Sequence, residues 1–421
     1  MKLALQEIQK LEAEHLVATY DRMPALIVRG KGVHMYAADG TKYLDFLSGL
    51  GVNAFGYAHP AITKVIARES KNLLHTSNLF FHPYQGELAK QLKELSGMDR
   101  VFFSNTGTEA MEGAIKFARA YARANNKNGS RPKWRVLAME NAFHGRTFGS
   151  VAMTWTEKYR KPFAPVMPGV RFVKFNDVAD LKKNMDASVC AIVFEPVQGE
   201  GGIRPATKEF MQAARELSTK NNALLILDEI QSGMGRTGKF FAFQHFGVKP
   251  DVVTVAKPIA GGLPLGAILT TEAVAKAIKP GMHGTTFGGG PLACAVALEC
   301  IDILKRDGLL QHVKEMGSYF KRKLLEVKAK SKHVVEVRSM GLMAALEIDS
   351  PEVAKAVVKS MLEQGVVINR THETALRFLP PFLIERKHVD EMTKKLEKAL
   401  EVASAAAAPA PKKKRSKKVG N

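Results

Sequence analysis

Short apolar runs separated by helical patterns are the feature that most constrains the fold of this chain. Between about residue 125 and residue 270 these runs include RVLAM, CAIVF, ALLIL and DVVTV. Runs of this length that alternate with helix-length segments are typical of strands in βαβ units, whose sheets are covered on both faces. The sequence therefore predicts an α/β fold with a large, mostly parallel sheet.

Three of these runs carry charged residues at their carboxyl ends. Glu195 follows CAIVF, Asp228 and Glu229 follow ALLIL, and Lys257 follows DVVTVA. Because the carboxyl ends of parallel strands lie along one edge of a sheet, and ligands of open α/β sheets bind there, we expect these side chains to meet. Each one alone is also explained as a strand end that faces water, but three in register indicate a binding site.

Smaller units flank the predicted sheet. The segment 33–46, VHMYAADGTKYLDF, is typical of a hairpin with Asp39 and Gly40 at its turn. After a long helix around ACAVALECIDIL, the runs VVEVR, LMAALEI and VVINR indicate a smaller α/β unit. The chain ends in SAAAAPAPKKKRSKK, a low-complexity segment that we expect to be disordered.

Composition narrows the class of protein without choosing a ligand. The chain has 421 residues, 46% of them hydrophobic, which is enough for one large domain and a smaller one. Its net charge is +21, and without the six basic residues within PKKKRSKKVG it is still +15. A basic protein can attract nucleic acid, anionic substrates or a phosphorylated cofactor. The tail has no interleaved aromatic residues and the chain has no recognition module, so a nucleic-acid binder is the weaker hypothesis.

The cysteine pattern and the N-terminal segment indicate a cytoplasmic protein with reduced thiols. Cys190, Cys294 and Cys300 have no metal-ligand spacing and lie in apolar segments, so we expect buried thiols and no metal site. The N-terminal stretch carries Glu7 and Lys10 where a signal peptide needs an uninterrupted apolar region. No segment has the length and apolar character of a membrane span.

Lys257 is the only ionisable residue in VVTVAKPIAGGLPLGAILTT, the segment 252–271. Burial lowers the pKa of a lysine, and the neutral amine can attack a carbonyl carbon to form a Schiff base. Gly261 and Gly262 allow a ligand to approach closely. Lys257 is therefore a candidate covalent anchor; the alternative is a lysine that extends from a strand end into water.

An aldehyde cofactor such as pyridoxal 5'-phosphate would make further demands on the chain. In SNTGTEAMEGAIK, Gly107 and Thr108 follow a strand and begin a helix, where backbone N–H groups can hold a phosphate; the spacing of Thr106 and Glu109 is equally that of a capping box that needs no ligand. Asp228 could pair with a pyridinium N–H. In NAFHGRTFG, Phe143 offers a ring face and Arg146 a carboxylate partner.

These motifs resemble those of the class III aminotransferases, which have pyridoxal-phosphate fold type I, from about residue 15 to residue 402. The resemblance is closest to members that act on acetylornithine. It implies a large cofactor domain at 61–300, a small domain built from 1–60 and 301–402, and a disordered basic tail at 403–421. The matching pieces are SNTGTEAMEGAIK, FHGRT, EPVQGEGG, LDEIQSGMGRTG, AKPIAGGLPLGA, HGTTFGGGPLACAVA and LRFLPP.

The resemblance also implies roles for individual residues. Lys257 would bind the cofactor covalently and move the proton between substrate and cofactor, while Asp228 would keep the pyridine nitrogen protonated. Arg146 and Arg377 would bind substrate carboxylates, and Glu200 would neutralise Arg377 when the amine donor is bound. The remaining implied contacts are Phe143 stacked on the ring, Gln231 near the ring hydroxyl, Gly107 and Thr108 at the phosphate, Thr286 at the phosphate of a neighbouring subunit, and Thr285 at the substrate.

The implied reaction moves the terminal amino group of N-acetylornithine to 2-oxoglutarate, giving N-acetylglutamate semialdehyde and glutamate, a step of arginine biosynthesis. The implied assembly is a homodimer with shared active sites. The alternatives are an ω-aminotransferase for 4-aminobutyrate, ornithine, succinylornithine or succinyl-diaminopimelate, or an aminomutase or racemase on the same fold. Ornithine aminotransferases usually have a tyrosine where this chain has Leu50, which argues against that alternative.

Overall fold

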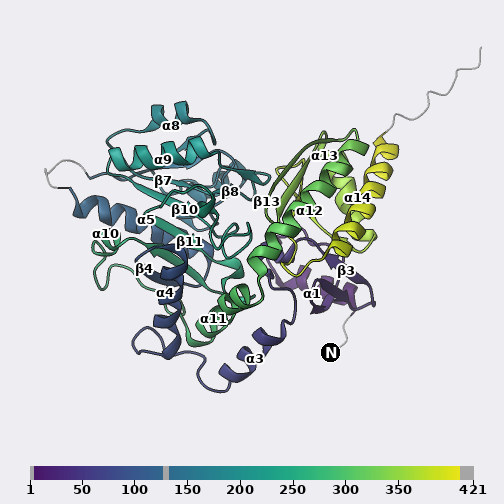
Figure 1. Cartoon of the computed structure of the whole chain (residues 1–421), viewed down its shortest axis with the longest axis horizontal. Coiled ribbons are helices and arrows are strands. Elements are labelled where there is room, and N and C mark those ends of the chain that lie inside the picture. Colours follow the sequence, from purple (N-terminus) through teal and green to yellow (C-terminus); the bar gives the residue numbers. More distant parts are fainter. Residues whose placement is uncertain (1–3, 127–131, 408–421) are drawn as a thin grey trace, which may run out of the picture.

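The computed structural model describes residues 4–126 and 132–407. A large lobe built around a seven-stranded sheet lies beside a smaller lobe in which α12 (Leu309–Lys330), α13 (Pro351–Glu363) and α14 (Arg386–Ala407) cover two four-stranded sheets (Figure 1). The fold is α/β, as the sequence predicts.

The strands of the large sheet run parallel except at one side. From β11 to β6 the neighbouring strands are parallel, whereas β12 is antiparallel to both of its neighbours. The prediction of a mostly parallel sheet is therefore confirmed. In spatial order the strands are β4 (Arg100–Ser104), β12 (Gly266–Thr270), β11 (Val252–Val255), β10 (Leu224–Asp228), β7 (Val189–Phe194), β5 (Arg135–Met139) and β6 (Val170–Val173).

Helices on both faces explain why these strands are continuously apolar. Within β10, Leu225 and Leu227 belong to the core that contains Phe210 of α9 (Lys208–Lys220), while Ile226 belongs to the core that contains Ala114 of α5 (Gly107–Ala124). Successive side chains of a strand point to opposite faces, so a strand that is covered on both sides needs apolar residues at every position.

Residues from both ends of the chain share the smaller lobe. The hairpin predicted at 33–46 is present as β2 (His34–Ala37) and β3 (Lys42–Asp45), with Gly40 at a φ of +92° in its turn. β15 (Val366–Val367) pairs with β3, so a C-terminal strand completes the N-terminal sheet that begins with β1 (Ile27–Lys31). This pairing supports a small domain formed by both termini, and the boundaries at residues 60 and 300 stay a prediction.

The run VVINR does not form one strand. It divides at Ile368 between β15 and β16 (Asn369–Thr371), which belong to different sheets. The sheet that contains β16 has three further strands, in the order β13 (Val334–Met340), β14 (Met343–Ile348) and β17 (Ala375–Phe378), with β16 next to β17. Arg377 lies in β17.

The prediction of disorder from residue 403 is wrong for residues 403–407, because α14 continues to Ala407 and the Ala403 side chain is buried. Alanine has the highest helix propensity, so an alanine run that follows a helix extends it. The rest of the predicted tail, 408–421, lies outside the described residues. Among the helices that the structure describes, we find none with the length and apolar character that a bilayer crossing requires. Cys190, Cys294 and Cys300 are free and buried, as predicted.

The remaining elements lie outside the large sheet and the two four-stranded sheets. The helices are α1 (Leu5–His15), α2 (Ser48–Gly51), α3 (Pro60–Glu69), α4 (Pro83–Ser96), α6 (Phe148–Ala152), α7 (Glu157–Arg160), α8 (Val178–Asn184), α10 (Glu272–Ala275) and α11 (Pro291–Arg306). Three 3₁₀ turns and a two-stranded ribbon complete the fold: η1 (Lys161–Phe163), η2 (Ala242–His245), η3 (Lys257–Ala260), β8 (Val197–Gln198) and β9 (Arg204–Pro205).

Candidate active site

A cavity of about 460 Å³ lies at the carboxyl edge of the large sheet. Three strand ends reach it, because Glu195 follows β7, Asp228 ends β10 and Lys257 follows β11. The meeting of these three residues was predicted from the strand pattern and is confirmed. Of the other predicted site residues, the cavity is lined by Gly107, Thr108, Phe143, Arg146, Glu200 and Gln231.

Lys257 lies at the start of η3 and lines the cavity. Its backbone has a φ of +47°, in the left-handed region that non-glycine residues rarely occupy. In the part of the chain that the structure describes, its ammonium has neither a hydrogen bond nor a carboxylate within 4.0 Å. Burial lowers the pKa of Lys257, and this effect outweighs the opposing charge of Glu200. Lys257 therefore has the environment of a nucleophilic amine.

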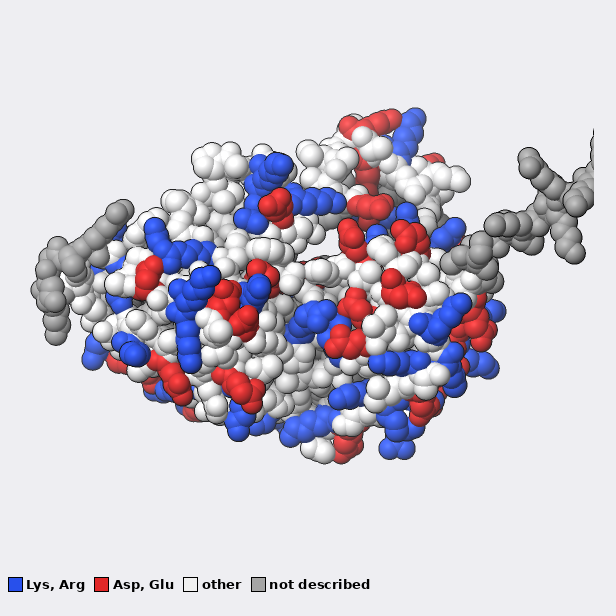
Figure 2. Space-filling model, turned by 90° about the horizontal axis from the view of Figure 1, so that it is seen from above, with Lys and Arg blue, Asp and Glu red and all other residues white. Residues whose placement is uncertain are grey.

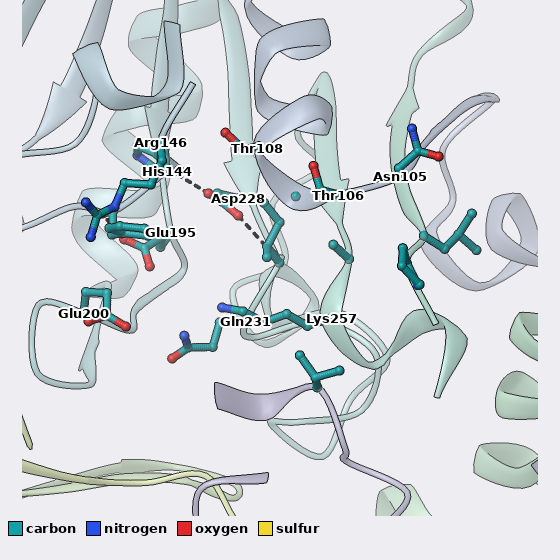
Figure 3. Close-up of a pocket in the computed structure, with 18 of the residues that line it drawn as sticks. Asn105, Thr106, Thr108, His144, Arg146, Glu195, Glu200, Asp228, Gln231 and Lys257 are labelled. Carbon is teal, nitrogen blue, oxygen red and sulfur yellow. Dashed lines mark hydrogen bonds and ion pairs between the residues drawn. The ribbon is translucent and has the colours of Figure 1, made fainter. Parts of the chain in front are cut away.

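Asp228 is buried at the end of β10 and is paired with a histidine. Its Oδ2 lies 2.7 Å from Nδ1 of His144, and its Oδ1 accepts a hydrogen bond of 3.0 Å from the Ile230 N–H (Figure 3). Burial opposes protonation of His144, but the hydrogen bond and charge of Asp228 outweigh it, so the pKa of His144 is raised. The pair fixes a buried carboxylate at the cavity, where it can accept a hydrogen bond from a cationic N–H.

Sequence reasoning missed His144, which also lines the cavity. It lies in the same FHGRT motif as Phe143 and Arg146, but a single histidine in a loop has no periodicity that would reveal its partner. Its Nε2 is buried and has no hydrogen-bond partner in the described part of the chain.

Glu195 joins two loops at the floor of the cavity. Its carboxylate accepts hydrogen bonds from the Phe143 N–H, at 3.2 Å, and from the Gly199 N–H, at 3.0 Å. Burial raises the pKa of Glu195 to about 7. The sequence placed Glu195 at this edge without a role; its contacts indicate that it fixes the loop of Phe143 relative to the loop of Glu200.

The N-terminus of α5 borders the cavity, and its capping is internal. Thr106 Oγ1 accepts a hydrogen bond of 3.3 Å from the Glu109 N–H, while Glu109 accepts one of 2.6 Å from the Asn105 N–H. The capping interpretation of this motif is therefore correct, with the glutamate bonded one residue earlier than in a standard box. Gly107 and Thr108 still line the cavity at the positive end of the helix, where an anion is stabilised.

Phe143 and Arg146 line the cavity from the loop that precedes α6. The Arg146 guanidinium lies 3.5 Å from the centroid of the Tyr159 ring and 5.6 Å from that of Phe143. Arg146 is exposed and has no carboxylate partner within the described residues. It is therefore available to an anionic ligand.

Glu200 and Arg377 form an ion pair at the mouth of the cavity. Nη1 of Arg377 donates to Glu200 Oε1 at 2.5 Å, and Nε donates to Asn369 Oδ1 at 3.2 Å. Arg377 is 1% exposed and does not line the cavity, whereas Glu200 is 34% exposed and does. Burial opposes ionisation of Glu200, but the charge and hydrogen bond of Arg377 outweigh it and lower the pKa. The glutamate thus covers the arginine.

Thr285 and Thr286, like Arg377, lie outside the cavity of the single chain. Thr285 Oγ1 accepts a hydrogen bond of 3.1 Å from Asn105 Nδ2, and Thr286 is exposed. Asn105 is a cavity residue, so Thr285 touches the site only indirectly. Their predicted contacts with substrate and with a neighbouring subunit's phosphate site stay predictions.

The cavity has the groups that a pyridoxal-phosphate site needs. It joins a partly buried amine, a buried carboxylate with a histidine partner, an aromatic ring and a helix N-terminus. Gln231 Oε1 is buried there without a partner in the described chain, so a polar ligand atom would satisfy it. This set of groups on an α/β sheet edge is typical of pyridoxal-phosphate enzymes of fold type I.

Comparison with known proteins gives the family. Residues 16–400 match the model of "Aminotransferase class-III". The chain is 46% identical to the acetylornithine aminotransferase of Methanocaldococcus jannaschii, over 92% of this chain and 96% of that protein. It is 44% identical to the acetylornithine aminotransferase of Aquifex aeolicus, over 92% of this chain and the whole of that protein. The chain belongs to the class III aminotransferases.

Solved structures agree with this assignment. One match is the ornithine aminotransferase of Toxoplasma gondii, which was crystallised with PLP partly occupying its active site. The TM-score is 0.91 and the sequence identity 32%, and the match covers 96% of this chain and 95% of the T. gondii chain. The acetylornithine aminotransferase of Elizabethkingia anophelis has a TM-score of 0.84 and 30% identity, over 95% of this chain and all of its own.

Proposed function

We propose that this protein uses pyridoxal 5'-phosphate to transfer the terminal amino group of N-acetylornithine to 2-oxoglutarate. The observation that carries this proposal is the covered arginine, Arg377, next to a cavity that contains the amine of Lys257. An enzyme of this kind must bind two substrates in one site, one with a single carboxylate and one with two. Relatives named acetylornithine aminotransferase at 46% and 44% identity support the choice of donor.

The cofactor, when bound, supplies an electrophilic carbonyl carbon and a ring that accepts electrons from the substrate carbon. Lys257 would hold it covalently and, once released, carry a proton to and from the substrate carbon. Asp228 would hold the proton of the ring nitrogen, with His144 fixing the carboxylate by its 2.7 Å contact. Phe143 would cover one ring face. The remaining contacts would be Gly107 and Thr108 at the phosphate and Gln231 at the ring hydroxyl.

The two carboxylate sites would separate the two half-reactions. N-acetylornithine reacts at its far amine and needs its α-carboxylate held away from the cofactor, which the unpaired, exposed Arg146 can do. 2-Oxoglutarate reacts next to its α-carboxylate, so it needs a cation close to the ring. Arg377 would provide that cation once Glu200 moves away, and Glu200 would cover it again during the first half-reaction. Thr285 would contact the substrate from the edge of the site.

We propose a homodimer in the cytoplasm as the active form. Thr286 is exposed in the single chain, and near it in sequence lies the exposed Phe287, while Leu79, Phe80 and Phe81 are 85%, 70% and 106% exposed. Consecutive large apolar side chains at the surface mark interaction sites. A second copy that covers them would bring its Thr286 to the phosphate site, so both active sites would be shared.

A turnover panel tests the donor and the acceptor together. Acetylornithine, ornithine, 4-aminobutyrate, succinylornithine and succinyl-diaminopimelate would each be offered with 2-oxoglutarate, and glutamate formation measured. We expect the highest kcat/KM for acetylornithine and no turnover without the oxo acid. A higher value for another donor would reassign the substrate, and turnover without an oxo acid would indicate an aminomutase or racemase.

A nucleic-acid role has little support from the surface. On the face that Figure 2 shows, lysine and arginine side chains alternate with aspartate and glutamate and do not gather into one basic groove. The excess of positive charge is therefore compatible with anionic substrates and a phosphorylated cofactor.

A further inference from the structure

Arg236 is a buried cation with no carboxylate partner. It is 0% exposed, and in the described part of the chain no acidic oxygen lies within 4.0 Å of it. Its Nε and Nη2 have no hydrogen-bond partner there. Burial lowers the pKa of Arg236 to about 9, with Asp45 as the only opposing charge. An uncompensated buried charge is destabilising, so its presence requires a reason beyond packing.

The contacts of Arg236 join two parts of the molecule. It belongs to the loop after β10, five residues beyond Gln231 of the cofactor cavity. Its Nη1 donates to the carbonyl oxygens of Pro380 and Leu342, and its own carbonyl accepts from the Leu342 N–H at 3.0 Å. The guanidinium carbon lies 4.6 Å from the centroid of the Phe382 ring. All of these partners belong to the C-terminal lobe.

Both carbonyl acceptors flank the strands that position Arg377. Leu342 directly precedes β14, and Pro380 follows β17 by two residues. These strands are paired, with Arg377 opposite Ala345. A single guanidinium therefore fixes the ends of two strands to the loop that carries Gln231.

The backbone at this junction leaves no room for adjustment. A Cβ added to Gly341, whose φ is +57°, would lie 2.6 Å from the Thr237 Cα and 2.7 Å from the Arg236 oxygen. The segment after β17 is also bonded to the N-terminal part of the chain, because the Leu379 N–H donates to the Phe46 oxygen at 2.7 Å. Three parts of the sequence thus meet around Arg236, and its side chain is the charged donor among them.

We propose that Arg236 is a positioning residue that holds the Arg377 strand at a fixed place relative to the cofactor loop, and so sets the affinity for the dicarboxylic substrate. This inference rests on the proposed role of Arg377. A carboxylate clamp acts through geometry, and displacement of such a group by about 1 Å can cost on the order of a hundredfold in rate. Arg146 is on a different loop and has no contact with Arg236, so binding of a substrate through Arg146 does not depend on this junction.

The test compares Arg236→Met with a matched control. Methionine keeps the length and apolar part of the side chain but donates no hydrogen bond. The control is Arg119→Met in α5, because Arg119 also donates to two backbone carbonyls, those of Trp134 and Pro168, each at 3.2 Å, and is far along the helix from the cavity. Single-turnover half-reactions with glutamate and with acetylornithine would be followed by the cofactor absorbance of the holoenzymes.

For Arg236→Met we expect the apparent Kd for glutamate and for 2-oxoglutarate to rise at least about tenfold, with less than about a threefold change for acetylornithine and an unchanged absorbance spectrum. Arg119→Met should alter melting temperature alone. Equal changes in both half-reactions, or none, would overturn the proposal. If Arg236→Met does not fold, Arg236→Lys, which keeps the charge but not the planar fork, must show the same selective loss. Wild-type turnover of acetylornithine, measured first, tests the proposed function separately.

Discussion

Removal of the carboxylate that covers Arg377 should change the two half-reactions in opposite directions. In Glu200→Gln the side chain keeps its length and can still accept a hydrogen bond, but its negative charge is lost. Among the described residues Arg377, which is 1% exposed, then has only neutral acceptors, the new amide oxygen and the Asn369 oxygen at 3.2 Å. The free arginine should bind the α-carboxylate of any amino acid that enters the cavity.

The contacts set the size of the effect. In the wild type, glutamate must displace the 2.5 Å contact between Arg377 and Glu200 before its own carboxylate can bind. A hydrogen bond to a charged group contributes about 1.5–3 kcal/mol, and about 1.4 kcal/mol corresponds to a factor of ten. The apparent Kd for glutamate should therefore fall about ten- to a hundredfold in the variant, while the half-reaction with acetylornithine slows because that donor can bind by its carboxylate in the wrong orientation.

Single-turnover measurements of each half-reaction, followed by cofactor absorbance, check this expectation. Glu347→Gln is the matched control, because Glu347 pairs with another buried arginine, Arg338, in the same sheet. We expect that control to lower the melting temperature without separating the half-reactions. If glutamate and acetylornithine change by the same factor in Glu200→Gln, then Glu200 is structural and does not select between substrates.

Three further changes test other parts of the site. Borohydride should fix the cofactor to the peptide that contains Lys257, and Lys257→Ala should show no such product in mass spectrometry; labelling of another lysine would refute the anchor. Asp228→Asn should fold and bind cofactor but lose kcat by a factor of about a hundred or more, since a neutral amide cannot hold the ring proton; near-normal kcat would contradict this role. Burial raises the pKa of Glu229 to about 7, above its unfolded value of 4.5, so the folded state binds the proton more tightly than the unfolded state. The free energy of unfolding of the wild type should therefore fall by up to about 3 kcal/mol between pH 4.5 and pH 7, compared with that of Glu229→Gln. If the stabilities of the two proteins, measured from melting curves, change with pH in the same way, this linkage is refuted.

The sequence predicted the strand-end residues because their position follows from topology alone. Glu195, Asp228 and Lys257 each follow an apolar run, and parallel strands place their carboxyl ends at one edge whatever the details of packing. His144 and Arg236 could not be found in this way. Their partners lie 84 and more than 100 residues away, and such contacts depend on how the loops pack.

The division of VVINR also depends on contacts between parts of the chain that are distant in sequence. An apolar run predicts burial, but whether it bends between two sheets depends on which strands lie nearby, and β15 is held by β3 from the other end of the chain. The predicted contact of Thr286 with a neighbouring subunit's phosphate site stays a prediction, because a single chain does not test it. What the sequence predicts best is therefore local pattern and the edge of the sheet at which the strand ends meet.

Backbone strain supports the position of the site independently of its side chains. Six non-glycine residues with positive φ lie on or next to the loops that form the cavity: Ser48, Leu50, Asn141, Ile203, Met234 and Lys257. A left-handed residue costs roughly 1–2 kcal/mol, and such strain persists only where the surroundings fix it, commonly at functional sites. At Lys257 the strain coincides with a partly buried ammonium that has no carboxylate partner within the described residues, so one residue combines two unfavourable features. A fold that retains both at the end of a central strand fixes the direction of one amine, as covalent attachment of a cofactor requires.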